Sequence, residues 1–293
     1  MKTKTFTRKG ASFTYRIFFT VLCLLGLFPA EPAAANIFDD LSQEVSRAFD
    51  YLMPDAWQDE NVRLALGGGA LQVPDYEGSN DYKTQLFPMI DFRLGDAILF
   101  QTNQVKLVAT DRPLRMGAIA RLDLGRSQDA NPAVAEINKV GTAIEVGGFA
   151  EGIVDNWVMQ IELRQDILSG HKGLIAKATL GRLFELGERW RVIAAGRMNW
   201  ANNRYTDSFF EITPAEAAAS GYRPFNPGGG FKDIGAGVIG SYAASDRVTV
   251  QAGFGYQRLL GGASNSPIVT GPGSADQMTA GIAVRYTVWR TQE

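Results

Sequence analysis

Residues 156–166 read Asn-Trp-Val-Met-Gln-Ile-Glu-Leu-Arg-Gln-Asp, and their alternation of side-chain types indicates the fold class. Large apolar side chains occupy every second position: Trp157, Met159, Ile161 and Leu163. Polar and charged side chains occupy the other parity: Asn156, Gln160, Glu162, Arg164 and Asp166. Successive side chains of a β-strand point to opposite faces. The stretch therefore predicts a strand with one apolar face and one polar face.

The same two-residue period returns along the chain. Clear copies lie at 190–200, 248–257 and 278–288, and weaker ones at 62–72, 86–92, 98–100, 105–109, 114–124, 140–152, 174–184 and 234–242. Many of these segments approach the roughly 9 to 11 residues that a tilted membrane strand needs. The pattern predicts an all-β fold, a transmembrane antiparallel up-and-down β-barrel of about 12 strands, within a range of about 10 to 12.

The first thirty-five residues have the features of a signal peptide. Basic residues precede an apolar run at 17–28, and Ala33-Ala34-Ala35 follows with the small residues that a signal peptidase reads. The run is too short for a retained helical anchor, which needs roughly 20 residues. We expect cleavage after Ala35, an N-terminal extension at 36–61, a barrel at 62–289 and a C-terminal tail at 290–293.

Composition excludes several classes of function. With 29 basic and 31 acidic residues the chain lacks the basic excess that nucleic-acid binding needs. Its one cysteine, Cys23, lies in the expected signal peptide, so the exported chain would carry no disulfide and no thiol chemistry. The one histidine, His171, stands between Gly170 and Lys172 in what resembles an exposed turn. We therefore expect no enzyme, no cofactor and no metal site.

Alternation alone does not distinguish a membrane barrel from a soluble one. Aromatic residues near strand ends favour the membrane, because interfacial girdles are built from them: Trp157, Trp190, Trp200, Tyr242, Tyr256, Tyr286 and Trp289. Export and girdle together predict the outer membrane of a Gram-negative-type envelope, with its lipids as contacts. The polar parity would then line the lumen with Arg115, Arg121, Arg164, Arg191, Arg197, Arg285, Asp123, Glu145, Glu151 and Glu162. These charges either tune ion passage or pair across the interior and fill it.

Two segments depart from the strand pattern. Apolar residues recur at helical spacing within 36–52, which predicts a short amphipathic helix whose role stays open: plug, membrane contact or periplasmic partner contact. A long loop at about 202–230 contains a second helical turn, with Thr213 as cap, Pro214 at its first position and Gly221 as its stop.

Several motifs closely resemble those of the MipA/OmpV family, the MltA-interacting outer-membrane proteins. The opening motif runs Val73-Pro74-Asp75-Tyr76-Glu77-Gly78-Ser79-Asn80-Asp81-Tyr82, and further similarity lies at 170–173, 205–221, 231–237 and 258–269. The motif residues that we single out, for a structural or a partner-binding role, are Pro74, Asp75, Tyr76, Glu77, Gly78, Ser79, Tyr205, Gly221, Arg258, Ser266 and Pro267. Taken without the family, Pro74 and Gly78 also suit an ordinary strand end and turn.

The resemblance implies a scaffold that brings a murein lytic transglycosylase and a bifunctional murein synthase together in cell-wall remodelling. The alternative is a small-solute channel, or a surface-exposed barrel of adhesin-like or envelope-stress type. Two features depart from the family pattern: the chain ends on Tyr286-Thr287-Val288-Trp289 plus four residues, and the extension at 36–60 is longer than usual.

Overall fold

The computed structural model describes residues 62–95, 97–110 and 114–291. The expected signal peptide and the expected helix at 36–52 lie outside this part of the chain. Twelve strands fill most of it: β1 (Val62–Pro74), β2 (Tyr82–Leu94), β3 (Ile98–Gln101), β4 (Gln104–Thr110), β5 (Arg115–Asp123), β6 (Ala143–Val154), β7 (Trp157–Asp166), β8 (Leu174–Glu185), β9 (Trp190–Ala201), β10 (Gly230–Ala243), β11 (Val248–Leu259) and β12 (Asp276–Thr291).

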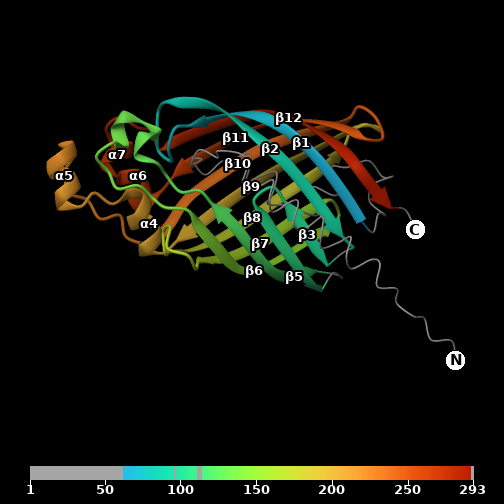
Figure 1. Ribbon diagram of the computed structural model, residues 1–293, viewed down its shortest axis with the longest axis horizontal. Helices are drawn as coiled ribbons and strands as arrows, with labels where there is room; N and C mark the ends of the chain where they lie inside the picture. The colour runs from blue at the N-terminus through green and yellow to red at the C-terminus, as the bar shows by residue number, and fades with distance from the viewer. Residues whose placement is uncertain (1–61, 96, 111–113, 292–293) are drawn as a thin grey trace. The chain divides into compact units, whose positions relative to one another are not determined.

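Each strand pairs antiparallel with the next, and β12 pairs with β1 through contacts such as Gly68 with Val284. The sheet is therefore a closed up-and-down barrel, drawn in Figure 1, and the fold prediction is confirmed. Closure removes the free edges that would otherwise expose backbone groups to lipid. No helix among the described residues is long and apolar enough to span a bilayer.

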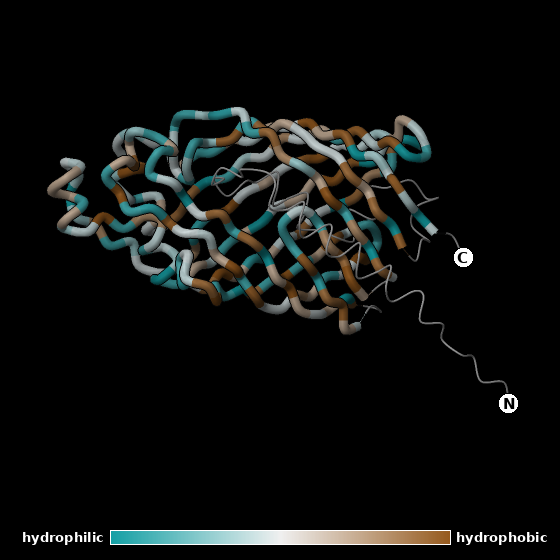
Figure 2. Tube along the Cα trace, in the orientation of Figure 1, coloured by the Kyte–Doolittle hydropathy of each residue, from teal (hydrophilic) through white to brown (hydrophobic). Residues whose placement is uncertain are grey.

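The two faces of the wall are reversed relative to a soluble protein. In β7 the polar side chains of Gln160, Glu162 and Arg164 are each at most 3% exposed, whereas Ile161 is 63% exposed. Along the trace, apolar and polar residues alternate on neighbouring positions of the strands (Figure 2). Apolar residues on the outside and polar residues inside are the arrangement that lipid requires of a barrel.

The two ends of the barrel differ. At one end, the turn end, connections are as short as Asp155 and Asn156, whose positive φ angles of 49° and 65° suit a tight hairpin. At the other, the loop end, lie the long connections at 75–81, 124–142, 167–173, 202–229 and 260–275. We call these five connections the loop cap. The loop-cap helices gather at one end of the barrel, away from the start of β1 and the end of β12 (Figure 1).

Short helices stiffen the loop cap. They are the 3-10 helices η2 (Gln128–Ala130) and η3 (Pro132–Val134) and the α-helices α4 (Asn203–Phe210), α5 (Pro214–Ser220), α6 (Gly261–Asn265) and α7 (Pro267–Thr270). Helix α5 begins and ends as expected, with a capping box at Thr213 and a left-handed Gly221. Helix α4 was not predicted, because its eight residues carry too short a pattern to separate from a loop.

The barrel wall is uneven on one side. Strand β3 pairs with β2 only from Asp91 to Leu94, although β2 begins at Tyr82. The connection 124–142 is hydrogen-bonded to the residues just before β2: the Asn131 amide donates to Asp75 and Asp81 at 2.9 and 3.0 Å. The loop cap thus ties the start of β2 to the β5–β6 connection where strand pairing with β3 is lacking.

Candidate functional site

The family-like motifs, distant in sequence, meet in the loop cap. The Tyr76 hydroxyl donates to the Ile268 carbonyl at 2.8 Å, and the Ser266 hydroxyl donates to the Phe210 carbonyl at 2.7 Å. The Gly78 N–H donates to the Gln277 side chain at 3.0 Å. The first two bonds join the first, third and last motifs, and the third bond ties the first motif to β12, so these motifs build one substructure.

The remaining motif residues complete the same substructure. Pro74 ends β1 opposite Tyr82, Glu77 forms an ion pair with Lys232 from β10, and Ser79 bridges to Gly273. Gly221 ends α5 and Pro267 begins α7. Arg258 stays on the surface, about half exposed, in an ion pair with Asp276 at 2.6 Å.

Gly78 shows why the opening motif needs a glycine. Its φ of 101° lies in the region that residues with side chains rarely adopt, and an added Cβ would stand 2.5 Å from a methyl group of Val269. The turn is therefore pressed directly against α7, which explains its composition without a ligand.

A hydrophobic core holds the loop cap together. Val134, Ile137, Phe210, Ile212 and Ile268 come from three different connections, and each is at most 1% exposed. Burial raises the pKa of the Tyr76 hydroxyl above its ordinary value, so it stays a neutral donor. The loop end of the barrel is thus closed by a packed structure with its own core.

One buried cation lies in this core. Arg126 donates to the carbonyls of Phe209 and Asn138 at 2.5 and 3.0 Å. Burial lowers the pKa of Arg126 to about 10, which still leaves the guanidinium charged at neutral pH. The arginine therefore satisfies two loop carbonyls with charge-assisted bonds.

His171 is not the exposed turn residue that the sequence indicated. It lies in a turn, but its side chain is 1% exposed and packs edge-on against Tyr205 of α4, with ring centroids 4.7 Å apart. Its Nε2 atom lies 3.1 Å from Glu145, and its Nδ1 accepts the Gly173 N–H at 3.0 Å. The flanking glycines indicated exposure, whereas α4, which was not predicted, covers the ring.

Three potential metal ligands meet beside this histidine: Asp123, Glu145 and His171, whose ligand atoms all lie within 4.8 Å of one another. The hydrogen bonds do not fit a metal site. Because Nδ1 accepts a backbone N–H, the single proton of the neutral ring sits on Nε2, which is the atom that faces Glu145. The Glu145 carboxylate also already accepts from Arg164 at 2.8 Å. His171, Glu145 and Arg164 therefore form a hydrogen-bonded histidine–carboxylate–arginine network.

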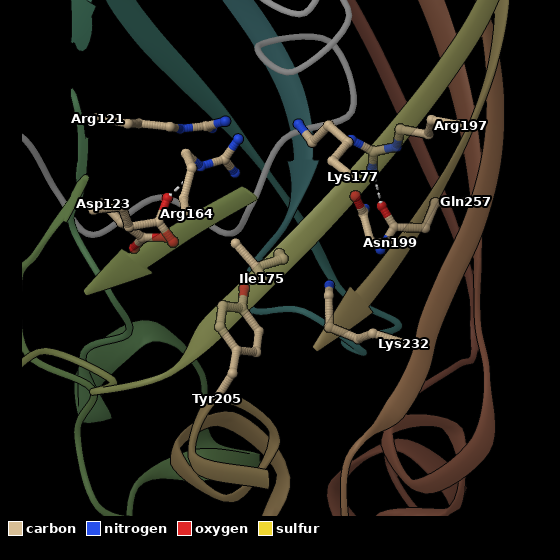
Figure 3. Close-up of a pocket in the computed structure, with 11 residues that line it drawn as sticks. Arg121, Asp123, Arg164, Ile175, Lys177, Arg197, Asn199, Tyr205, Lys232 and Gln257 are labelled. Carbon is tan, nitrogen blue, oxygen red and sulfur yellow. Dashed lines mark hydrogen bonds and ion pairs between the residues drawn. The ribbon is translucent and has the colours of Figure 1, made fainter. Parts of the chain in front are cut away.

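The lumen below the loop cap is lined by charge. All ten of the charges that the sequence assigned to it sit on the inward parity: Arg115, Arg164, Arg191, Arg197, Arg285, Glu145, Glu151 and Glu162 are buried, and Arg121 and Asp123 are half-buried. Figure 3 shows Arg121 and Arg164 beside Asp123, with Lys177 and Arg197 across the space. The cavity between them holds about 20 Å³, little more than one water molecule.

The sequence prediction missed several lumen charges, among them Lys106, Lys177 and Asp91, which share the inward parity of weaker strands. It also missed the pair Lys232 and Asp233. A bulge between Phe231 and Asp233 turns both adjacent side chains inward, where they form an ion pair at 2.7 Å. Strict alternation would have placed one of these two side chains in lipid. The pair could therefore not be predicted without knowing the position of the bulge.

A family model described as MltA-interacting protein MipA matches residues 66–288. The chain belongs to the MipA family. The match spans the whole loop cap and all but the first and last few residues of the barrel, so the converging motifs lie within the MipA-family match.

Solved barrels resemble this MipA-family chain only distantly. The NanC porin shares 12% identity with a TM-score of 0.41, over 76% of this chain and 98% of that one. An outer membrane channel from Pseudomonas putida F1 shares 11% with a TM-score of 0.38, over 77% and 95%. OmpT of Vibrio cholerae shares 9% with a TM-score of 0.37, over 78% and 96%. No curated protein matches the chain by sequence.

Family membership and the lipid-facing wall locate the protein. A closed barrel with an apolar outer surface and a polar interior, in the MipA family, is an outer-membrane protein. Barrels of this membrane have short periplasmic turns and longer extracellular loops. The turn end therefore faces the periplasm, and the loop cap faces outward.

Proposed function

We propose that this MipA-family barrel is a non-enzymatic, non-conducting anchor that holds a murein lytic transglycosylase, and with it a bifunctional murein synthase, at the inner face of the outer membrane. The observation that carries the proposal is the sealed loop end. A packed cap blocks a continuous path through the barrel. The family description names MltA as a partner.

The ion pairs in the lumen also support a barrel that does not conduct. Buried carboxylates and cations pair across it, as Arg164 does with Glu145 and Lys106 with Glu151 at 2.8 and 3.0 Å. Such pairs fill the interior and stiffen it, whereas a solute path needs continuous water. The second candidate function is a small-ion channel, which the mixed charge of the lumen, taken alone, favours. A conductance measurement distinguishes the channel from the anchor.

A periplasmic partner would meet the turn end. The connections at 186–189 and 244–247 carry exposed charges, Glu188 and Arg189 in the first and Asp246 and Arg247 in the second. Their small area limits what they bind alone, so residues 36–61 would add to the interface.

The test is crosslinking of tagged protein in intact envelopes, followed by mass spectrometry, with an unrelated barrel of similar abundance as control. We expect specific enrichment of murein hydrolases and synthases. The paired change Glu188→Lys with Asp246→Lys should reduce that enrichment several-fold, because it reverses charge on the turn end.

The matched control is Arg223→Glu, which reverses an exposed charge on the outward loop cap. It should leave periplasmic capture unchanged. No enrichment over the unrelated barrel, together with ohmic conductance of the purified protein, would replace the anchor with the channel.

A further inference from the structure

Two cations stand on the lipid-facing parity of the described strands, one near each end of the barrel. Arg258 lies at the loop end of β11, where the Asp276 carboxylate neutralises it with bonds at 2.6 and 2.8 Å. Arg182 lies on β8, three residues before that strand ends at Glu185. It is exposed, and no carboxylate in the described part of the chain forms an ion pair with it. Arg182 is therefore a cation on the outer wall whose charge the described residues do not balance.

Two aromatic rings contact the Arg182 guanidinium. Trp157 stands opposite Arg182 in the pairing of β7 with β8, and its ring centroid lies 5.3 Å from the guanidinium carbon. The ring centroid of Phe184, two residues further along the same face of β8, lies at 5.8 Å. Both distances are within the range of a cation–π interaction. The rings orient the guanidinium but are poor acceptors for its N–H groups, so these donors stay available to an anion.

The aromatic residues also set the depth of Arg182 in the membrane. Trp190 of β9, 50% exposed, and Tyr242 of β10 continue the girdle around the turn end, with ring centroids 4.8 Å apart. Aromatic girdles lie at the boundary between acyl chains and headgroups. Arg182 stands about 10 Å along the strand from Glu185, and less than that along the membrane normal because barrel strands tilt. The guanidinium thus reaches the headgroups of the periplasmic leaflet, where phosphates are the abundant anions.

The wall beside Arg182 leaves room for a lipid. On the β9 side Arg182 pairs with Ala194, and Gly196 follows on the same face. A Cβ built at Gly196 would have no side-chain atom of another residue within 4 Å, apart from its neighbours in the chain. An acyl chain can therefore lie against the small residues of β9 while its phosphate stays beside the guanidinium.

We propose that Arg182, Trp157 and Phe184 bind the phosphate of an anionic phospholipid, of the phosphatidylglycerol class, in the periplasmic leaflet. The planar guanidinium forms bidentate, charge-assisted bonds with phosphate oxygens. Selection depends on net charge, because a zwitterionic headgroup carries its own cation beside the phosphate and an anionic headgroup does not. The site rests on the orientation of the barrel and not on the anchor function.

The first test measures lipid preference by native mass spectrometry of the full-length exported chain in detergent micelles. The probes are phosphatidylglycerol and phosphatidylcholine with the same acyl chains, each added at the same concentrations. The parent should bind phosphatidylglycerol about five-fold more tightly, in line with the attraction of one arginine near a membrane surface for anionic lipid. Arg182→Gln should bind the two lipids equally.

Arg258→Gln is the charge-matched control. It removes one positive charge from the same lipid-facing parity, but at a site where Asp276 already balances that charge. The preference of the parent should persist in this variant.

Trp157→Leu tests the part that the ring plays in the site. It keeps the charge of Arg182 and an apolar side chain opposite it, and removes the ring. The preference for phosphatidylglycerol should fall about two-fold, because an exposed cation–π contact contributes about that much. An unchanged preference would contradict the ring's part in the site.

Inorganic phosphate distinguishes a lipid site from a site for a free anion. In large excess over the lipid it should not displace phosphatidylglycerol, because it lacks the acyl chains that hold the lipid against the wall. Displacement would overturn the proposal. So would equal binding of the two lipids by the parent, or an equal loss of preference in Arg182→Gln and Arg258→Gln. Heat-modifiable mobility in gels checks that each variant has a folded barrel.

Discussion

At the scale of single residues, the burial and hydrogen bonding of His171 could not be predicted from the sequence. A lone histidine in the sequence Gly170-His171-Lys172-Gly173 indicated an exposed turn, whereas its side chain is buried against Tyr205 and hydrogen-bonded to Glu145, 26 positions away. No local pattern encodes that pairing, because it depends on β6, β7 and α4 meeting in space. Gly78 is the opposite case, since the turn itself required a glycine and the residue type indicated as much.

Replacing His171 should therefore destabilise the protein. His171→Ala leaves the Gly173 N–H and a Glu145 oxygen without their partner and removes the ring under α4. We expect the free energy of unfolding to fall by about 2–4 kcal/mol, measured by urea unfolding in lipid vesicles. Lys139→Ala, at an exposed position of the loop cap, should change it by less than about 0.5 kcal/mol.

Glu216 should make the loop cap sensitive to acid. Burial opposes its charge, but bonds from Thr213 and from the Asn138 N–H, the latter at 2.7 Å, hold the pKa of this carboxyl below its ordinary value. The unfolded cap then binds the proton more readily, so stability is fully present above about pH 4.3 and is lost as pH falls through the lowered folded pKa.

The check is hydrogen exchange of the Asn138 amide, expressed as a protection factor between about pH 5 and pH 3. In the parent chain protection should decline with acidification. In Glu216→Gln it should vary little over that range, because the amide does not titrate there and its oxygen can still accept the Asn138 N–H. Parallel declines in both proteins would contradict the assignment.

At the scale of elements, alternation predicted the strands because lipid outside and charge inside impose opposite chemistry on the two faces. It was weakest at β3, which has four residues, and at the β10 bulge, where Lys232 and Asp233 break the period. The loop cap could be predicted only in pieces. Thr213 and Gly221 marked α5 locally, but the packing of α5, α4 and α7 into one cap depends on chain closure over long distances.

The loop cap should be able to loosen while the barrel stays folded. Phe210 is fully buried in the core of the loop cap, so Phe210→Ala should leave a cavity there and loosen the cap. Trypsin added outside cells should then cleave faster after the exposed Arg204 and Arg223, because cleavage needs local unfolding of the chain around them. Barrel integrity, read as heat-modifiable mobility, should persist, because the strand ladders do not depend on Phe210. Phe231→Ala, which removes a lipid-facing ring that is 56% exposed, should not increase cleavage.

At the scale of the whole molecule, the loop cap seals the outer end of the barrel, and the turn end faces the periplasm. The orientation has a direct consequence for surface labelling. Ala218→Cys on α5 should react with an impermeant maleimide on intact cells, whereas Ser245→Cys in a turn should react only after the outer membrane is permeabilised. The reverse result would show that the barrel has the opposite orientation, and the turn end could then not bind a periplasmic partner.

Conductance in planar bilayers tests the sealed barrel most directly. In the positive control, residues 203–228 of the loop cap are replaced by a short turn, which the pairing of Ala201 with Gly230 permits. The account predicts that the intact protein is silent while this variant forms steady ohmic pores. Steady pores from the intact protein would contradict it.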